Sequence, residues 1–271
     1  MTAFVHHFSF EFRRGLRDRN LLLMNYLFPL GFFALMGVLM TQVNPGFKET
    51  MVPAMVIFAL LSSAVLALPG PLVAAREEGI YRSYRINGVP TISILVIPAV
   101  TTIFHMVLVA AVIVIAGPLL FGARMPVNGL GFGLTFVAIA VACTGLGVLI
   151  GVIASDSRAI VLWSQLIFLP SMILGGLMLP VSMLPATMSR IAWLLPSTQA
   201  MNAFNSLGLG LPATRPPLQS IAILFAGGLL AFALAIYLFK WDNRSDTHRG
   251  NPALALLALL PYVAGMILFA V

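Results

Sequence analysis

The chain has 271 residues, of which 60% are hydrophobic and only 8% charged, and its mean hydropathy is +1.03. Soluble domains average roughly 45–50% apolar and 25% charged residues, so this composition excludes a water-soluble fold, which could not bury so much apolar surface. The net charge of +7 does not indicate nucleic-acid binding, because basic residues without a soluble domain are typical of membrane loops. A single cysteine, Cys143, excludes an internal disulfide and a metal site built from cysteines.

Apolar residues recur every four positions before the first long apolar run, at Phe4, Phe8, Phe12 and Leu16. This spacing predicts a helix over residues 1–20 that lies in the membrane interface, with Arg13, Arg14 and Arg17 turned away from the bilayer. A flexible basic tail is the alternative. The apolar run that follows is longer than the roughly 7–15 residues of a signal peptide, so we expect it to remain in the mature protein.

Seven uncharged apolar runs are long enough to cross a bilayer, because about 20 helical residues span its roughly 30 Å hydrocarbon core. They cover residues 21–41, 51–75, 92–121, 130–154, 160–179, 220–239 and 252–271. Every Lys, Arg, Asp and Glu lies outside these runs, since a charge at the membrane centre costs about 2.5–3.5 kcal/mol. The sequence therefore predicts an all-α integral membrane protein. Residues 21–249 would form a six-span domain, and residues 250–271 an additional seventh helix.

The distribution of cations predicts the orientation. A cytoplasmic N-terminus places eleven basic residues inside: Arg13, Arg14, Arg17, Arg19, Arg76, Arg82, Arg85, Arg158, Lys240, Arg244 and Arg249. It leaves four outside: Lys48, Arg124, Arg190 and Arg215. This asymmetry satisfies the positive-inside rule. With seven spans, the C-terminus would then lie outside the cell.

The loop between the second and third runs, residues 76–90, combines charged and aromatic side chains. As one continuous helix, this loop places Glu77, Tyr81, Tyr84 and Gly88 on one side and Glu78, Arg82 and Arg85 on another. Such a helix would end naturally at Gly88 and Pro90, and its acids and arginines suit the helix dipole. A short amphipathic helix joined to two spans is suited to receive force from a partner protein. The alternative is a solvated connector.

Three segments resemble the type-2 ABC exporter permease family. The run from Ala75 to Gly79, followed by Tyr81-Arg82, resembles that family's R-E-x-G-T-x-E-x-L coupling segment. Residues 169–180, 184–185 and 191–200 resemble its fifth span, its external re-entrant hairpin and the descent into its sixth span. Residues 13–20 with 28–30 resemble its N-terminal helix and first span. Ile80 and Arg82 depart from the pattern, standing where the family often has Thr and Glu, and the seventh run departs because the family usually ends soon after six spans.

The resemblance implies a permease subunit of an ATP-driven exporter for a lipophilic substrate, in a prokaryotic plasma or inner membrane. It implies a second permease subunit, identical or different, and cytoplasmic ABC ATPase subunits that carry ATP and Mg²⁺. The contact with the ATPase would include Glu77, Glu78, Gly79, Tyr81, Arg82 and Arg85, and by topology Asp156 and Arg158 in the second cytoplasmic connector. A helix cap at Asp156 or Ser157 before Ile160 explains this connector equally well. A non-transporting membrane scaffold or sensor that keeps the permease fold is the alternative function.

The chain itself lacks the sequence motifs of an enzyme. Lys48 and Lys240 both follow phenylalanine, so there is no Gly-Lys-Ser/Thr phosphate loop and we expect no ATP to bind this chain. No His precedes Glu, which excludes an H-E-x-x-H zinc site, and Ser206 has no glycine two residues before it, which excludes a G-x-S-x-G elbow. We expect no catalytic residue, no metal and no cofactor in this chain.

Several residues inside the spans are candidates for a lipophilic path between two protomers: Phe32, Phe58, Ser62, Ser63, Trp163, Gln165, Phe168 and Ser171. The alternative for all of them is helix packing or lipid contact. His105, near the middle of a span, is a candidate for proton relay, with a hydrogen-bonded packing role as the alternative. Gly147 and Gly151 have the G-x-x-x-G spacing that permits close helix packing.

Overall fold

The computed structural model describes residues 18–241 and 250–268, so most of the predicted interfacial helix over residues 1–20 lies outside the described part. Every regular element in this part is helical. Within the described residues, six segments are long and apolar enough to cross a membrane: Arg19–Val43, Met51–Glu77, Thr91–Phe121, Gly129–Ile153, Ser157–Leu174 and Pro217–Leu238. The prediction of an all-α integral membrane protein with six family-like spans is confirmed.

The first two spans are each built from consecutive helices. The first contains α2 (Arg19–Leu22), the π-helical turn η1 (Leu23–Leu27) and α3 (Phe28–Val43), and the short helix η2 (Pro45–Glu49) follows it. The second contains α4 (Met51–Leu61), the π-helical turn η3 (Ser62–Ala67) and α5 (Pro69–Glu77). The short helix α6 (Ile80–Ile86) precedes the third span.

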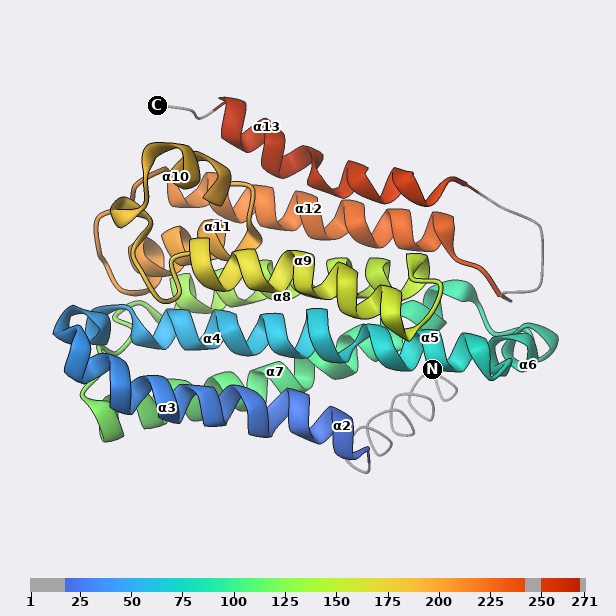
Figure 1. Ribbon diagram of the computed structural model, residues 1–271, viewed down its shortest axis with the longest axis horizontal. Coiled ribbons are helices and arrows are strands. Elements are labelled where there is room, and N and C mark those ends of the chain that lie inside the picture. Colours follow the sequence, from blue (N-terminus) through green and yellow to red (C-terminus); the bar gives the residue numbers. More distant parts are fainter. Residues whose placement is uncertain (1–17, 242–249, 269–271) are drawn as a thin grey trace.

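Single helices form the remaining four spans, which are α7 (Thr91–Phe121), α8 (Gly129–Ile153), α9 (Ser157–Leu174) and α12 (Pro217–Leu238). Between α9 and α12 lie η4 (Val181–Met183), α10 (Ala186–Ala192), α11 (Pro196–Ala203) and the π-helical turn η5 (Phe204–Gly208). After α12 come η6 (Pro252–Leu259), in 3₁₀ geometry, and α13 (Leu260–Leu268). Figure 1 shows α6 at one end of the bundle and α10 at the other, which we call the α6 end and the α10 end.

Glycines allow α8 to occupy the centre of the bundle. A Cβ atom on Gly228 of α12 would lie 2.6 Å from the carbonyl oxygen of Val141, so α12 contacts the α8 backbone directly. On another side of α8, a Cβ on Gly147 would overlap the carbonyl oxygen of Ala64, and one on Gly151 would lie 2.7 Å from the Leu72 side chain. The predicted close packing at Gly147 and Gly151 is confirmed.

Two serines bind backbone carbonyls in the π-helical turns. The Ser62 hydroxyl donates to the Met24 carbonyl in η1 at 2.6 Å, and the Ser164 hydroxyl donates to the Val65 carbonyl in η3 at 2.7 Å. A π-helical turn disturbs the regular i to i+4 bonding, and an unsatisfied backbone group inside a bilayer costs several kcal/mol. These two bonds therefore offset the irregular backbone and join the first, second and fifth spans.

The fifth span ends earlier than the sequence predicts. The predicted run extends to residue 179, whereas α9 ends at Leu174. Gly176 has a φ of +83°, a conformation that ends helices and that side chains rarely adopt. A Cβ on Gly175 would overlap the Ser197 hydroxyl, so the chain turns where α11 packs closely against it.

The hairpin of α10 and α11 lies at the α10 end (Figure 1). Its turn reaches inward, because Leu194 and Leu195 line the same cleft as Leu146 of α8 and Pro170 of α9. This position is compatible with the predicted re-entrant hairpin, and its re-entry into the membrane stays a prediction.

The segment Pro252–Leu268 runs back along α12 (Figure 1). Gly250 lies beside Leu238 at the end of α12, while the Gly265 carbonyl accepts a hydrogen bond of 3.2 Å from Arg215, just before α12 begins. The Tyr262 ring occupies the space that a side chain at Gly227 would fill. The eight residues of η6 in 3₁₀ geometry and the nine of α13 in α geometry together extend over about 30 Å, which is the thickness of the hydrocarbon core. The described part of the segment has fewer residues than each of the six spans, and its crossing stays a prediction.

Candidate functional site

The polar loop between the second and third spans is divided into two helices. α5 ends at Glu77, Glu78 closes its last turn, and α6 begins at Ile80. Between them Gly79 has a φ of +74°, in the left-handed region that favours glycine. The single continuous helix expected from the sequence is therefore wrong. Glu77 and Glu78 belong to the end of the second span, and the loop helix proper carries the arginines.

The outward face of this loop carries both charges and an apolar group. Glu77, Glu78, Arg82 and Arg85 are exposed. Ile86, at the end of α6, is 80% exposed, which makes it one of the most exposed large apolar side chains of the described chain. Ile86 is absent from the contact residues predicted above, although an isolated isoleucine among polar residues at the end of a connector helix is a signal for such a contact.

Tyr81 faces the interior, unlike the other predicted contact residues of α6. It is 4% exposed, and its hydroxyl donates to the Leu72 carbonyl of α5 at 2.9 Å. Its ring centroid lies 5.3 Å from that of Phe239, just after α12. Tyr81 therefore anchors α6 to α5 and to the end of α12, and does not reach the surface that a partner protein would contact.

Arg76 lies buried at the end of α5. It is 5% exposed, and its guanidinium donates to the Val152 carbonyl at 2.9 Å, to the Ala154 carbonyl, and at 3.5 Å to the Gly151 carbonyl. The last carbonyls of a helix have no partner within it and carry a partial negative charge. Arg76 thus binds the C-terminal end of α8. The sequence placed it among the cytoplasmic cations and gave no signal of this role.

Asp156 begins α9 in the second connector. One of its carboxylate oxygens accepts hydrogen bonds of 2.9 Å from the backbone amides of Arg158 and Ala159. The bond from Ala159 is the main cause that holds the pKa of Asp156 below its ordinary value. The helix-cap interpretation is confirmed. Asp156 and Arg158 are both exposed, so their side chains also lie on the outer face of the connector.

The two connectors meet at the α6 end. Ala154, whose carbonyl binds Arg76, also packs with Val73 of α5 and Ile160 of α9. We define the connector surface as the exposed charged and large apolar residues of both connectors: Glu77, Glu78, Arg82, Arg85, Ile86, Asp156 and Arg158. It presents acids, arginines and one large apolar side chain, which suits binding to a folded protein. The described residues hold no group of three His, Cys, Asp or Glu side chains that could bind a metal.

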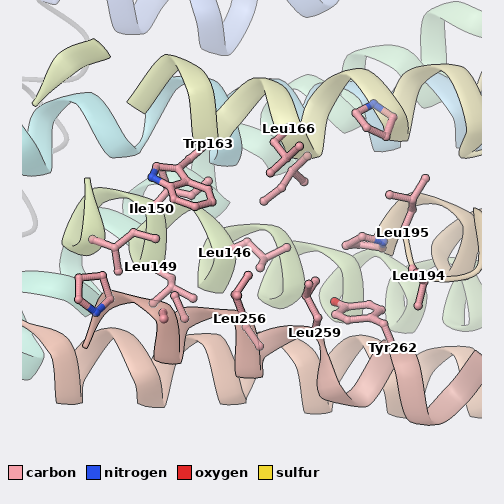
Figure 2. Close-up of a pocket in the computed structure, with 18 of the residues that line it drawn as sticks. Leu146, Leu149, Ile150, Trp163, Leu166, Leu194, Leu195, Leu256, Leu259 and Tyr262 are labelled. Atoms are coloured by element: carbon pink, nitrogen blue, oxygen red, sulfur yellow. The ribbon is translucent and has the colours of Figure 1, made fainter. Parts of the chain in front are cut away.

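The candidate path residues fall in two different places. Phe32 stacks on Phe58 with ring centroids 4.0 Å apart, and Phe58 lies 5.7 Å from Phe168, so α3, α4 and α9 meet in one aromatic cluster. Ser62, Ser63 and Ser171 are also buried inside the chain, as the packing alternative expects. Trp163 instead lines an apolar cleft beside the C-terminal segment (Figure 2), and Gln165 is half-buried on α9. Within one chain these residues do not line a common path.

His105 connects the first and third spans. The Tyr26 hydroxyl and Nδ1 of His105 lie 2.5 Å apart, and the two rings meet edge to face with centroids 5.5 Å apart. This contact fits the alternative of a hydrogen-bonded packing residue.

The sequence also matches a family model described as ABC-2 type transporter, over residues 2–208. The matched stretch covers well over half of the chain and includes both connectors and the hairpin of α10 and α11. It excludes α12 and the C-terminal segment. A search among curated proteins finds no significant match.

Proposed function

The chain belongs to the ABC-2 type transporter family, and on this premise we propose that it is the permease subunit of an exporter that moves a lipophilic substrate out of the cytoplasm. A separate cytoplasmic ABC ATPase subunit binds ATP and Mg²⁺ and supplies the energy. Two permease subunits, identical or different, assemble with the ATPase subunits. The connector surface receives the ATPase.

The bonding around the connector surface is the observation that best supports this proposal. α6 is held to α5 by Tyr81, and the end of α5 is held to α8 by Arg76. α9 starts at the Asp156 cap, directly after the carbonyls that Arg76 binds. A force on α6 therefore acts on the second, fourth and fifth spans together, as required of a rigid-body change in access.

The apolar residue contributes more to ATPase binding than the exposed charges. A solvent-exposed ion pair is worth about 0.2–1 kcal/mol. Complete burial of an isoleucine side chain is worth about 1.5–3 kcal/mol, and Ile86 has most of its surface still to bury. The charges of Glu77, Glu78 and Arg85 then set the orientation of the partner.

The distribution of charge supports a cytoplasmic location for the α6 end. Its connectors and chain segments carry Arg19, Arg76, Arg82, Arg85, Arg158 and Lys240. The α10 end carries Lys48, Arg124, Arg190 and Arg215, and Arg124 is paired there with Glu49 at 2.9 Å. The positive-inside rule assigns the richer end to the cytoplasm, where ATP is available.

Copurification tests the proposal. The chain is tagged and expressed with ABC ATPases encoded near it, and the purified complex is reconstituted in vesicles and screened for stimulation of ATP hydrolysis by lipophilic compounds. We expect an ATPase to copurify with wild type and to be lost with Ile86→Asp, while Val43→Asp, at the exposed opposite end of the first span, retains it. A wild-type chain that binds no ATPase would favour the scaffold function instead.

A further inference from the structure

An apolar cleft of about 590 Å³ lies between the C-terminal segment and helices α8 and α9 (Figure 2). α8 contributes Leu146 and Ile150, α9 contributes Trp163 and Leu166, and the C-terminal segment contributes Leu256 and Leu259. Its volume lies within the roughly 300–1,000 Å³ typical of sites for small ligands. One wall of the cleft therefore comes from residues beyond the stretch that matches the family.

The lining selects a hydrocarbon ligand. All of the lining side chains are aliphatic, aromatic or proline, and only the Trp163 indole and the Tyr262 hydroxyl add polar groups. A polar ligand would lose its hydrogen bonds to water here without replacing them, at a cost of about 2–7 kcal/mol for each buried amide or hydroxyl.

The length of the cleft matches one leaflet of a bilayer. Six of the eight η6 residues line its C-terminal wall, from Pro252 at one end of η6 to Leu259 at the other, and η6 extends over about 16 Å in 3₁₀ geometry. Half of the hydrocarbon core is about 15 Å thick. The lining residues of α8 belong to its last turns, next to the carbonyls that Arg76 binds, so the cleft begins near the α6 end and extends inward to Leu194 and Leu195 of the α10–α11 hairpin.

The cleft is accessible from the side. Leu166 and Leu256, on its two facing walls, are 64% and 60% exposed, and Trp163 is 39% exposed. In the single chain these side chains form the outer rim of the cleft, so an acyl chain can enter it from the side.

We propose that this cleft is a binding site for one acyl chain of a phospholipid from the leaflet at the α6 end. The chain fills the space between the C-terminal segment and α8 and α9, the two helices whose ends meet at the connector surface. The bound lipid is a resident component of the protein and not its transported substrate, so the site is independent of the proposed function.

Native mass spectrometry of the full chain, after detergent washing that removes loosely held lipid, tests the proposal. Ala253→Phe and Ala255→Phe place a ring in the cleft, and Ala264→Phe places the same ring on the exposed face of α13 as the control. We expect one phospholipid to remain on wild type and on Ala264→Phe, and its occupancy to fall at least tenfold in both cleft variants. Thermal unfolding in detergent verifies that each variant is folded, and Ala253 is exposed, so its substitution disturbs no packing.

Fluorescence gives the position of the bound chain. In a variant with Trp193→Phe and Trp241→Phe, Trp163 is the remaining tryptophan. Phosphatidylcholine brominated in the middle of its acyl chains should quench Trp163 persistently after washing, and Ala255→Phe should abolish that quenching. The proposal is overturned if the cleft variants retain lipid as wild type does, if wild type retains none, or if the retained molecule is not a lipid. None of these results depends on export or on an ATPase.

Discussion

Replacing Arg76 with methionine removes a buried cation that holds two spans together. The methionine keeps most of the apolar length of the side chain but leaves the Val152 and Ala154 carbonyls without their donor. A hydrogen bond to a charged group is worth about 1.5–3 kcal/mol, so the two closest bonds together favour folding by several kcal/mol. Burial of the guanidinium also costs several kcal/mol in desolvation, and this cost is absent in the methionine variant. We expect a net loss of about 2 kcal/mol, because unsatisfied carbonyls remain buried.

The loss should be local. Hydrogen exchange followed by mass spectrometry should show faster exchange in the last turn of α8 and in the first turn of α9, with little change in α7. Arg76→Lys should give an intermediate result, because an ammonium is a compact point charge that cannot span two carbonyls as the planar guanidinium does. Arg82→Met, at an exposed position of α6, is the control.

Coupling should suffer more than stability in the same variant, because Arg76 joins the two connectors. In reconstituted vesicles, the ATPase bound to Arg76→Met should hydrolyse ATP at a near-normal rate, while the export rate of the complex falls severalfold. Unchanged exchange at the end of α8, together with normal export, would refute the role assigned to Arg76.

Three further predictions concern the α5–α6 turn, the Asp156 cap and the topology of the C-terminal segment. Gly79→Ala should destabilise the α5–α6 turn by about 1–2 kcal/mol, because an alanine in the left-handed region is strained, and Gly79→Asn should cost less in a thermal unfolding assay, since Asn tolerates that region. Equal stability of both variants and wild type would contradict this. The stabilising effect of the Asp156 cap should be fully present above the unfolded-state pKa of roughly 3.9, and it should be lost as the pH falls through the lower folded-state pKa. The stability of α9 should therefore depend less on acid pH in Asp156→Asn than in wild type. A reporter that is active only in the cytoplasm should stay silent when fused after Val271, because residues 252–271 are predicted to cross the membrane. An active reporter would contradict this seventh span.

Composition and apolar run length were sufficient to predict the spans. The boundaries of five of the six agree within a few residues, because a charge or a proline ends each run near the membrane surface. The fifth differs because its end is set by contact between Gly175 and α11, which run length does not reveal.

The candidate site was predicted less completely. The sequence located both connectors, since each lies between two apolar runs and carries charges. It did not show that the helix breaks at Gly79. A helix can include an isolated glycine, so the break becomes evident only from the backbone angle of Gly79. Arg76 bonds to residues more than 70 positions away in the sequence, beyond any local pattern. The inward turn of Tyr81 likewise depends on a contact in the folded chain, its hydrogen bond to the Leu72 carbonyl.

The coupling ratio, the amount of substrate exported per ATP hydrolysed, tests the central claim most directly. It is measured in vesicles at equal expression for Glu77→Ala, Glu78→Ala and Ile86→Ala, beside Lys48→Ala at the α10 end. A role for the connector surface in transmission predicts a ratio reduced severalfold in the first three variants, most in Ile86→Ala, and unchanged in Lys48→Ala. Ratios equal to that of Lys48→Ala in all three would contradict the claim, and the connectors would then be solvated links between spans.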